Sequence, residues 1–105
     1  MKGKACLVVR ATVPEADRKA FDKWYQDEHL GDALKTFGAE RAWRCWSKND
    51  PAVHCAYYLF PSVAKAEAVQ QFPGTRRLVA DFDATWQGRV TRTREVLEYA
   101  QALDP

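Results

Sequence analysis

The sequence contains few of the residues that mark a metal site or a disulfide framework. It has only three cysteines, Cys6, Cys45 and Cys55, and they are far apart in the chain. Each lies in an apolar or aromatic run, which is typical of small buried thiols in a reducing compartment. We therefore expect no disulfide framework, no metal site and no cofactor, while a catalytic cysteine stays open as an alternative.

The chain also lacks long hydrophobic runs and any excess of charge of one sign. No apolar stretch approaches the roughly 20 residues that span a bilayer, and the first five residues lead into a strand-like run rather than a signal sequence. The 16 basic and 14 acidic residues give a formal net charge of +2, and the basic residues are scattered. We therefore expect a cytoplasmic protein that binds neither membranes nor nucleic acids.

What the chain does have is enough apolar material for one core. It is 105 residues long, 47% hydrophobic and 12% aromatic, with neither internal repeats nor linker-like segments. A chain of this size usually forms one domain. We expect residues 1–105 to form a single domain.

The pattern of β-branched runs, helical periodicity and turn residues predicts the order β-α-β-β-α-β. We expect strands at residues 4–13, 39–48, 53–60 and 91–99, and helices at about 14–29, 33–37, 63–71 and 76–88. Gly31 is a poor helix residue and Asp32 a good N-cap, which predicts a break after Leu30. The order predicts an α+β, ferredoxin-like fold in which a four-stranded antiparallel sheet carries both main helices on one face.

The strands have large apolar residues at both odd and even positions, as Trp43 and Trp46 or Tyr57 and Tyr58 show. A sheet that is apolar on both faces has both faces buried. Because two helices cover only one face, we expect a second copy of the chain to cover the other. This predicts a homodimer in which two sheets face each other and enclose a small lumen, where a small-molecule ligand binds.

One helical stripe ends in titratable groups instead of another aliphatic residue. Its members follow helical spacing: Phe21, Trp24, Tyr25, Glu28 and His29. Imidazole titrates near pH ~6.5 and transfers protons well at neutral pH. We interpret His29 and Glu28 as candidate catalytic residues. The alternative is that both only hydrogen-bond a broken helix end.

These residues carry a resemblance to a known family. The pattern F-x-x-W-Y-x-x-E-H-L, which ends at Leu30, resembles that of the EthD-like proteins of the dimeric α/β-barrel superfamily. The resemblance implies a dimeric ferredoxin-like fold. It also implies small-molecule chemistry of the kind found in cofactor-independent monooxygenases, muconolactone-type isomerases, polyketide cyclases and dehydratases, and haem proteins.

Further candidates for substrate binding lie on the same stripe and on the strands: Trp24, Tyr25, Arg10, Arg44, Trp46 and His54. Arg10 interrupts an apolar strand, and we expect it to pair with Glu28 or with an anionic substrate. His54 opens a strand, so its default interpretation is a solvated histidine at the rim. The side of the sheet faced by Arg44, Arg92 and Arg94 cannot be decided from the pattern.

Three classes of function are consistent with these residues. The first is an enzyme that acts by proton transfer or cofactor-free oxygenation on a small aromatic or polyketide-like substrate. The second is a small-ligand binder without catalysis. The third, least favoured because no haem or metal spacing is present, is a haem protein.

Overall fold

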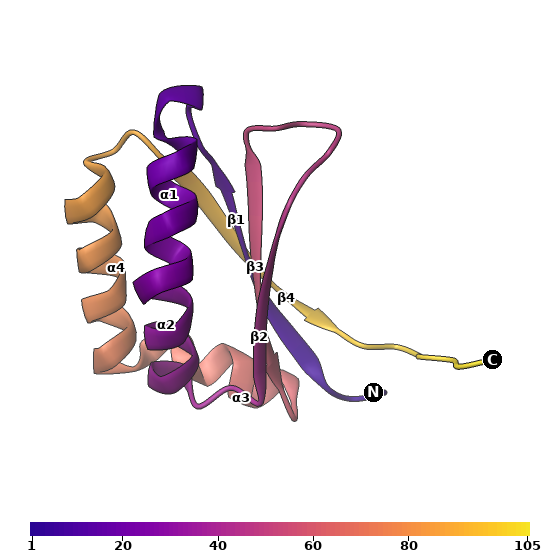
Figure 1. Ribbon diagram of the computed structural model, residues 1–105. Coiled ribbons are helices and arrows are strands. Elements are labelled where there is room, and N and C mark those ends of the chain that lie inside the picture. Colours follow the sequence, from indigo (N-terminus) through magenta and orange to yellow (C-terminus); the bar gives the residue numbers. More distant parts are fainter.

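The computed structural model describes residues 1–105 and contains four strands (Figure 1). The strands are β1 (Ala5–Thr12), β2 (Arg41–Trp46), β3 (Val53–Phe60) and β4 (Thr91–Glu98). The helices are α1 (Arg18–Trp24), α2 (Leu30–Phe37), α3 (Val63–Ala68) and α4 (Pro73–Trp86). Short 3-10 turns η1 (Glu15–Asp17) and η3 (Val69–Gln71) precede α1 and follow α3, and a π-helical turn η2 (Tyr25–His29) joins α1 to α2.

The strands form one antiparallel sheet in the order β2-β3-β1-β4. The first strand, β1, lies in the middle and pairs with β3 and β4, so Ala5 is opposite both Phe60 and Glu98. This is the arrangement of a ferredoxin-like fold. The predicted fold class is confirmed.

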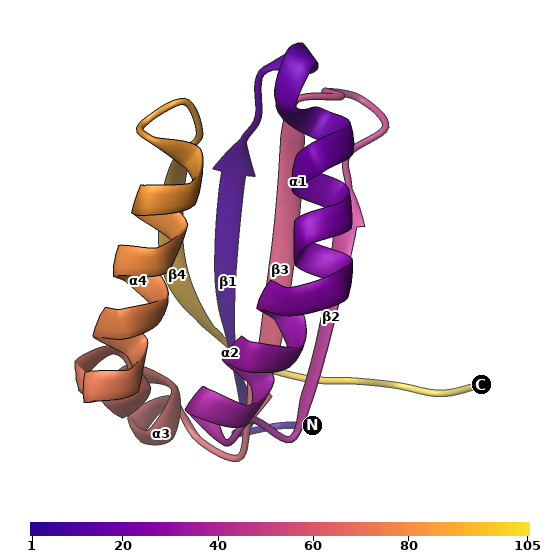
Figure 2. The same ribbon diagram turned by 60° about the vertical axis from the view of Figure 1, so that its left-hand side comes forward.

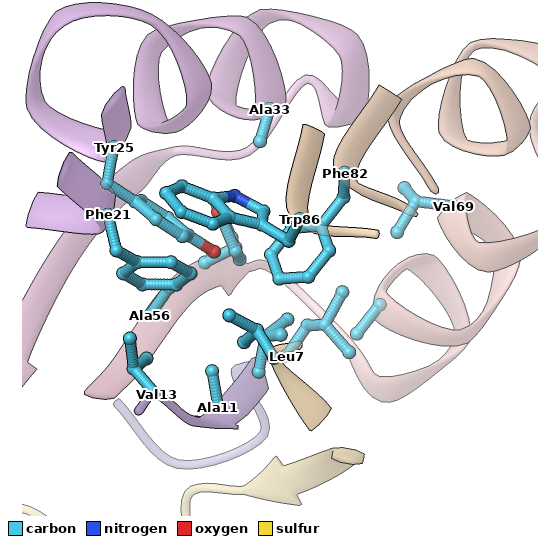
Figure 3. Packing of buried hydrophobic residues seen from close by; sticks show 14 of the residues in the cluster. Leu7, Ala11, Val13, Phe21, Tyr25, Ala33, Ala56, Val69, Phe82 and Trp86 are labelled. Carbon is cyan, nitrogen blue, oxygen red and sulfur yellow. The ribbon is translucent and has the colours of Figure 1, made fainter. Parts of the chain in front are cut away.

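Helices α1, α2 and α4 lie on one face of the sheet, and α3 lies at one end of it (Figure 2). The odd-numbered residues of β1 face these helices, because Leu7, Val9 and Ala11 belong to the core of 16 buried residues. The rings of Phe21, Phe82 and others gather above this face of the sheet (Figure 3). The packing against one face fixes the strand register, since a one-residue slip would turn these side chains outward.

The predicted helix break after Leu30 is wrong. His29 and Leu30 have right-handed helical dihedrals, and Gly31 lies inside α2, exposed and without any atom near its missing Cβ. The helix ends instead at Gly38, whose φ of 62° is left-handed and favours glycine. The apolar stripe therefore continues to Phe37, and tertiary packing outweighs the low helix propensity of one glycine.

Two smaller boundaries also differ from the prediction. Helix α4 begins at Pro73 rather than Arg76, because proline suits the first helical turn, where its missing N–H costs nothing. Strand β2 spans only Arg41–Trp46, shorter than predicted. The expected N-cap of α3 is confirmed, since the Ser62 hydroxyl accepts a hydrogen bond from the backbone N–H of Lys65 at 3.2 Å.

Candidate functional site

The π-helical turn η2 determines how the histidine of the sequence motif is oriented. Residues five apart on an α-helix diverge by about 140°, so Trp24 and His29 would not share a face. The wider π turn brings such residues together, and the two rings stack with centroids 4.3 Å apart and planes at 17°. Turns of this kind occur frequently at functional sites.

His29 lies in an aromatic environment between the helices and the sheet, and it is 8% exposed. Its ring also contacts Tyr25, at 4.9 Å between centroids, and Phe82, at 5.8 Å. Burial, followed by the positive charges of Arg92 and Arg94, lowers the pKa of His29 to about 4. The imidazole is therefore neutral at pH 7 and is free to accept a proton.

A cavity of about 30 Å³ opens beside His29. Apolar side chains from β1, α2 and α4 supply half of its 12 lining residues. Beside His29, the polar groups come from Tyr25, Tyr58, Thr75, Arg92 and Arg94. A water molecule needs roughly 10–15 Å³ measured in this way, whereas a benzene ring occupies a cavity of about 150 Å³. In this conformation the cavity holds about two water-sized atoms and no aromatic ring.

The two tyrosines of the cavity are buried and keep their protons. Burial raises the pKa of Tyr25 to about 12, and it also raises the pKa of Tyr58. Tyr58 lies on the helix-facing side of β3, opposite Leu7 of β1. The two hydroxyl groups hydrogen-bond each other, so at neutral pH the Tyr25–Tyr58 pair has one O–H left to donate to a bound molecule.

The two arginines of the cavity come from β4, whose even-numbered residues face the helices. Arg92 has a side chain only 13% exposed, stacks over Phe82 at 3.8 Å and pairs with Asp83 through Nη1 and Oδ1 at 3.2 Å. Arg94 is exposed and has no carboxylate partner among the ion pairs of the chain. The cavity therefore has an excess of positive charge.

The structure brings only part of the predicted site together. Tyr25 contacts His29, as the helical stripe indicated, whereas Trp24 contacts it only because of the π turn. Glu28 is exposed on the solvent side of the helix near Lys23 and does not line the cavity. Arg10 is exposed on the sheet face away from the helices, opposite Cys55 and Thr93. The predicted pair between Arg10 and Glu28 is therefore wrong, because the sheet separates them.

Arg44, Trp46 and His54 form a separate cluster under α1, together with Asp22. One carboxylate oxygen of Asp22 accepts hydrogen bonds from Arg44 Nη1 at 2.7 Å and from Trp46 Nε1 at 2.8 Å. These bonds from Trp46 and Arg44 lower the pKa of Asp22. None of the four residues lines the His29 cavity. The cluster joins α1 to the sheet, and no pattern in the sequence singled out Asp22.

His54 is not the solvated histidine that its position in the sequence suggested. It is 0% exposed and lies 4.6 Å from the ring of Tyr25. Arg44 Nη1 lies 3.4 Å from His54 Nε2, which therefore acts as the acceptor and leaves the proton on Nδ1, without a partner. Burial, followed by the charge of Arg44, lowers the pKa of His54 to about 4. The prediction of a rim histidine is wrong.

The outer face of the sheet carries side chains that no helix covers. Trp43 and Tyr57 stack there with centroids 5.3 Å apart and planes at 8°, and Leu97 is 46% exposed. We define the outer face by these residues and by Val8, Cys45 and Cys55, which the strand register places on the same side. The His29 cavity opens on the opposite side of the sheet, so His29 does not face a lumen between two sheets.

Comparison with known proteins supports the fold. No family model matches the chain, and no curated protein matches it. Among solved structures, an EthD family protein from Bacillus halodurans superimposes with a TM-score of 0.73 at 15% identity, covering 91% of this chain and 98% of its own. A mutant of SnoaB, a cofactor-independent oxygenase from Streptomyces nogalater, gives 0.72 at 14% identity, covering 98% and 99%. This chain shares the ferredoxin-like fold of these proteins.

A third structure with a similar fold is that of an antibiotic biosynthesis monooxygenase, which superimposes with a TM-score of 0.62 at 12% identity and covers 95% of this chain and 99% of its own. Identities this low establish the shared fold and leave the chemistry to the residues of this chain. Within its fold, no helix is both long and apolar enough to cross a membrane. The structure also contains no group of three or more histidine, cysteine or acidic side chains that could hold a metal ion.

Proposed function

We propose that this protein belongs to the dimeric α/β-barrel superfamily and is a small-molecule enzyme of the kind represented by cofactor-independent oxygenases, cyclases and dehydratases. In the proposal His29 accepts a proton from a small aromatic or polyketide-like substrate. The observation that carries the proposal is a buried, neutral imidazole at a π-helical turn beside a cavity with an excess of positive charge.

The chemistry follows from the groups around the cavity. His29 takes a proton from the carbon next to a carbonyl group. The C–H electron pair forms a carbon–carbon double bond, and the π pair of the carbonyl group moves to its oxygen, which gives an enolate. Arg94 stabilises the negative charge on this oxygen, and the remaining O–H of the Tyr25–Tyr58 pair donates a hydrogen bond to it. The similarity to SnoaB, which is a cofactor-independent oxygenase, supports this class of reaction.

A ring needs more space than the cavity of about 30 Å³ offers. The substrate body therefore lies outside the cavity, and only its reacting edge reaches His29. Arg94 is the exposed part of the wall, so its side chain is the one that can move to admit a substrate.

The test is a turnover screen of aromatic polyketide intermediates and lactones, repeated with His29→Gln. Glutamine retains much of the volume of the imidazole but does not titrate, and we expect turnover to fall by 10²–10⁴-fold, the usual contribution of a general base. Glu28→Gln is the matched control, because Glu28 is exposed and should leave turnover unchanged. Unchanged turnover in His29→Gln contradicts the proposal, and ligand binding without any turnover favours a non-catalytic binder.

We also propose that the chain is a homodimer in which a second copy covers the outer face. The support is the half-buried stack of Trp43 and Tyr57 on this face, together with the exposed Leu97. A flat apolar sheet face that stays in water is unfavourable. Light scattering at micromolar concentration should give about twice the chain mass of 12.0 kDa. Trp43→Glu should give a folded monomer; a wild-type monomer contradicts the proposal.

A further inference from the structure

We propose that the cavity beside His29 binds the carboxylate group of an organic acid, with Arg94 as its main partner and Arg92 as its second. The inference rests on the proposed function in taking this acid as the substrate. The fold does not specify this substrate class, and the experiment below measures ligand binding instead of turnover.

The wall of the cavity carries more positive than negative charge. Arg92 and Arg94 stand two residues apart on the same face of β4, and both line the cavity. Only Arg92 has a carboxylate partner, Asp83, which is itself 67% exposed and so compensates weakly. Burial, followed by the positive charge of Arg94, lowers the pKa of Arg92, because the two guanidinium groups repel each other. An anion between them removes this repulsion.

The size and shape of the cavity also suit a carboxylate group. The cavity of about 30 Å³ has room for about two water-sized atoms, which matches the two oxygens of a carboxylate. Arginine binds carboxylates with two parallel hydrogen bonds from its planar guanidinium. The Tyr25–Tyr58 pair adds a neutral hydroxyl donor to the wall. The cavity therefore suits the acid group, while the rest of the molecule lies outside.

The bound carboxylate also changes His29. The charged groups that face the imidazole are Arg92 and Arg94 of β4, which lower its pKa, with the exposed Asp83 of α4 bound to Arg92. Helix α2 contributes only Ala33 and Phe37 to the cavity, and the tyrosines are neutral. The more distant His54 is also neutral. A negative charge within about 4–6 Å favours the imidazolium ion, so the substrate itself makes His29 a stronger base.

The experiment is an NMR titration of the His29 ring in the full chain, with benzoate as the probe and benzamide as its neutral counterpart. We expect benzoate to raise the pKa of His29 by about 1 or more. Benzamide, which has the same shape without the charge, should bind at least 10-fold more weakly. Because His29 and His54 are the only histidines, His54→Gln assigns the signals.

Arg94→Gln should weaken benzoate binding at least 10-fold and should leave the protein folded, because Arg94 is exposed and unpaired. Arg94→Lys, which retains the charge, should restore part of the affinity. Arg76→Gln is the matched control, since Arg76 is an exposed arginine of α4 that does not line the cavity. Equal binding of benzoate and benzamide, or equal benzoate affinity in Arg94→Gln and wild type, overturns the inference.

The two proposals fail in different ways. Benzoate binding that raises the pKa of His29, in a protein that turns over none of the screened compounds, supports the carboxylate site and contradicts the enzyme. Turnover that depends on His29 but is unaffected by Arg94→Gln supports the enzyme and contradicts the carboxylate site.

Discussion

At the scale of single residues, Phe21 is the centre of the aromatic core. It is 0% exposed, and its ring lies within about 6 Å of six others: Trp24, Tyr25, Trp46, His54, Phe82 and Trp86. We expect Phe21→Ala to lower the free energy of unfolding by about 3–5 kcal/mol. Trp24 is only partly buried, so Trp24→Ala should cost less. Urea unfolding of both variants at one protein concentration checks the order; a larger loss for Trp24→Ala contradicts it.

Gly31 gives a second prediction at this scale. It lies inside α2, exposed, and a Cβ added there would meet no atom within 4 Å. Gly31→Ala should raise the free energy of unfolding by about 0.5–1 kcal/mol, because alanine loses less backbone entropy in a helix than glycine does. Gly38→Ala is the control with opposite sign, since Gly38 has a φ of 62°. A loss of stability in Gly31→Ala, measured by thermal unfolding, would show that the helix is broken there.

The sequence predicts the buried stripe well and the individual polar residues poorly. Helical spacing correctly places Phe21, Tyr25 and His29 on one face, because side chains four residues apart on a helix point to the same side. Nothing local fixes the environment of His54, which is buried only because α1 packs over β3. The π turn that stacks Trp24 on His29 could not be predicted from the sequence either, since it depends on hydrogen bonds between residues five apart.

At the scale of elements, the close approach of α2 and α4 forms one side of the cavity. A Cβ on Gly74 would lie 2.7 Å from Thr36 Cγ2, closer than real contacts permit. Threonine is β-branched and turns little, so α4 must shift. We expect Gly74→Ala to lower the free energy of unfolding by about 1–3 kcal/mol, although alanine favours a helix. Adding Thr36→Ser, which deletes Cγ2, should recover most of the loss in urea unfolding. No recovery contradicts this contact.

The order of elements was predictable because each strand and helix has its own local signal. Alternation and β-branched residues identify β1 and β3, and periodicity identifies α4. The sides of the strands were not predictable, because both parities are apolar. The strand register shows which residues face the helices, because Ala11, which belongs to the core, is opposite His54 and Arg92. This register places Arg92 and Arg94 at the cavity and Arg10 on the outer face.

At the scale of the whole molecule, two buried histidines make stability depend on pH. Both His29 and His54 have a pKa of about 4 when folded, below the ordinary value of 6.5. Above pH 6.5 both states hold them neutral, so their full contribution to stability is present. As the pH falls from 6.5 towards 4, the unfolded chain binds two protons that the folded chain does not. Each histidine then costs about 1.4 kcal/mol per pH unit.

Between pH 7 and pH 5 we therefore expect the free energy of unfolding to fall by about 3–4 kcal/mol. Asp22 does not add to this change. Because its pKa is lowered in the folded protein, its contribution to stability is lost only when the pH falls below the ordinary value of 3.8. The measurement is urea unfolding at both pH values and one protein concentration, since a dimer makes stability depend on concentration. In His54→Gln the fall should be about half as large, whatever the absolute stability of the variant. An undiminished fall in that variant would mean that His54 is accessible to protons in the folded protein.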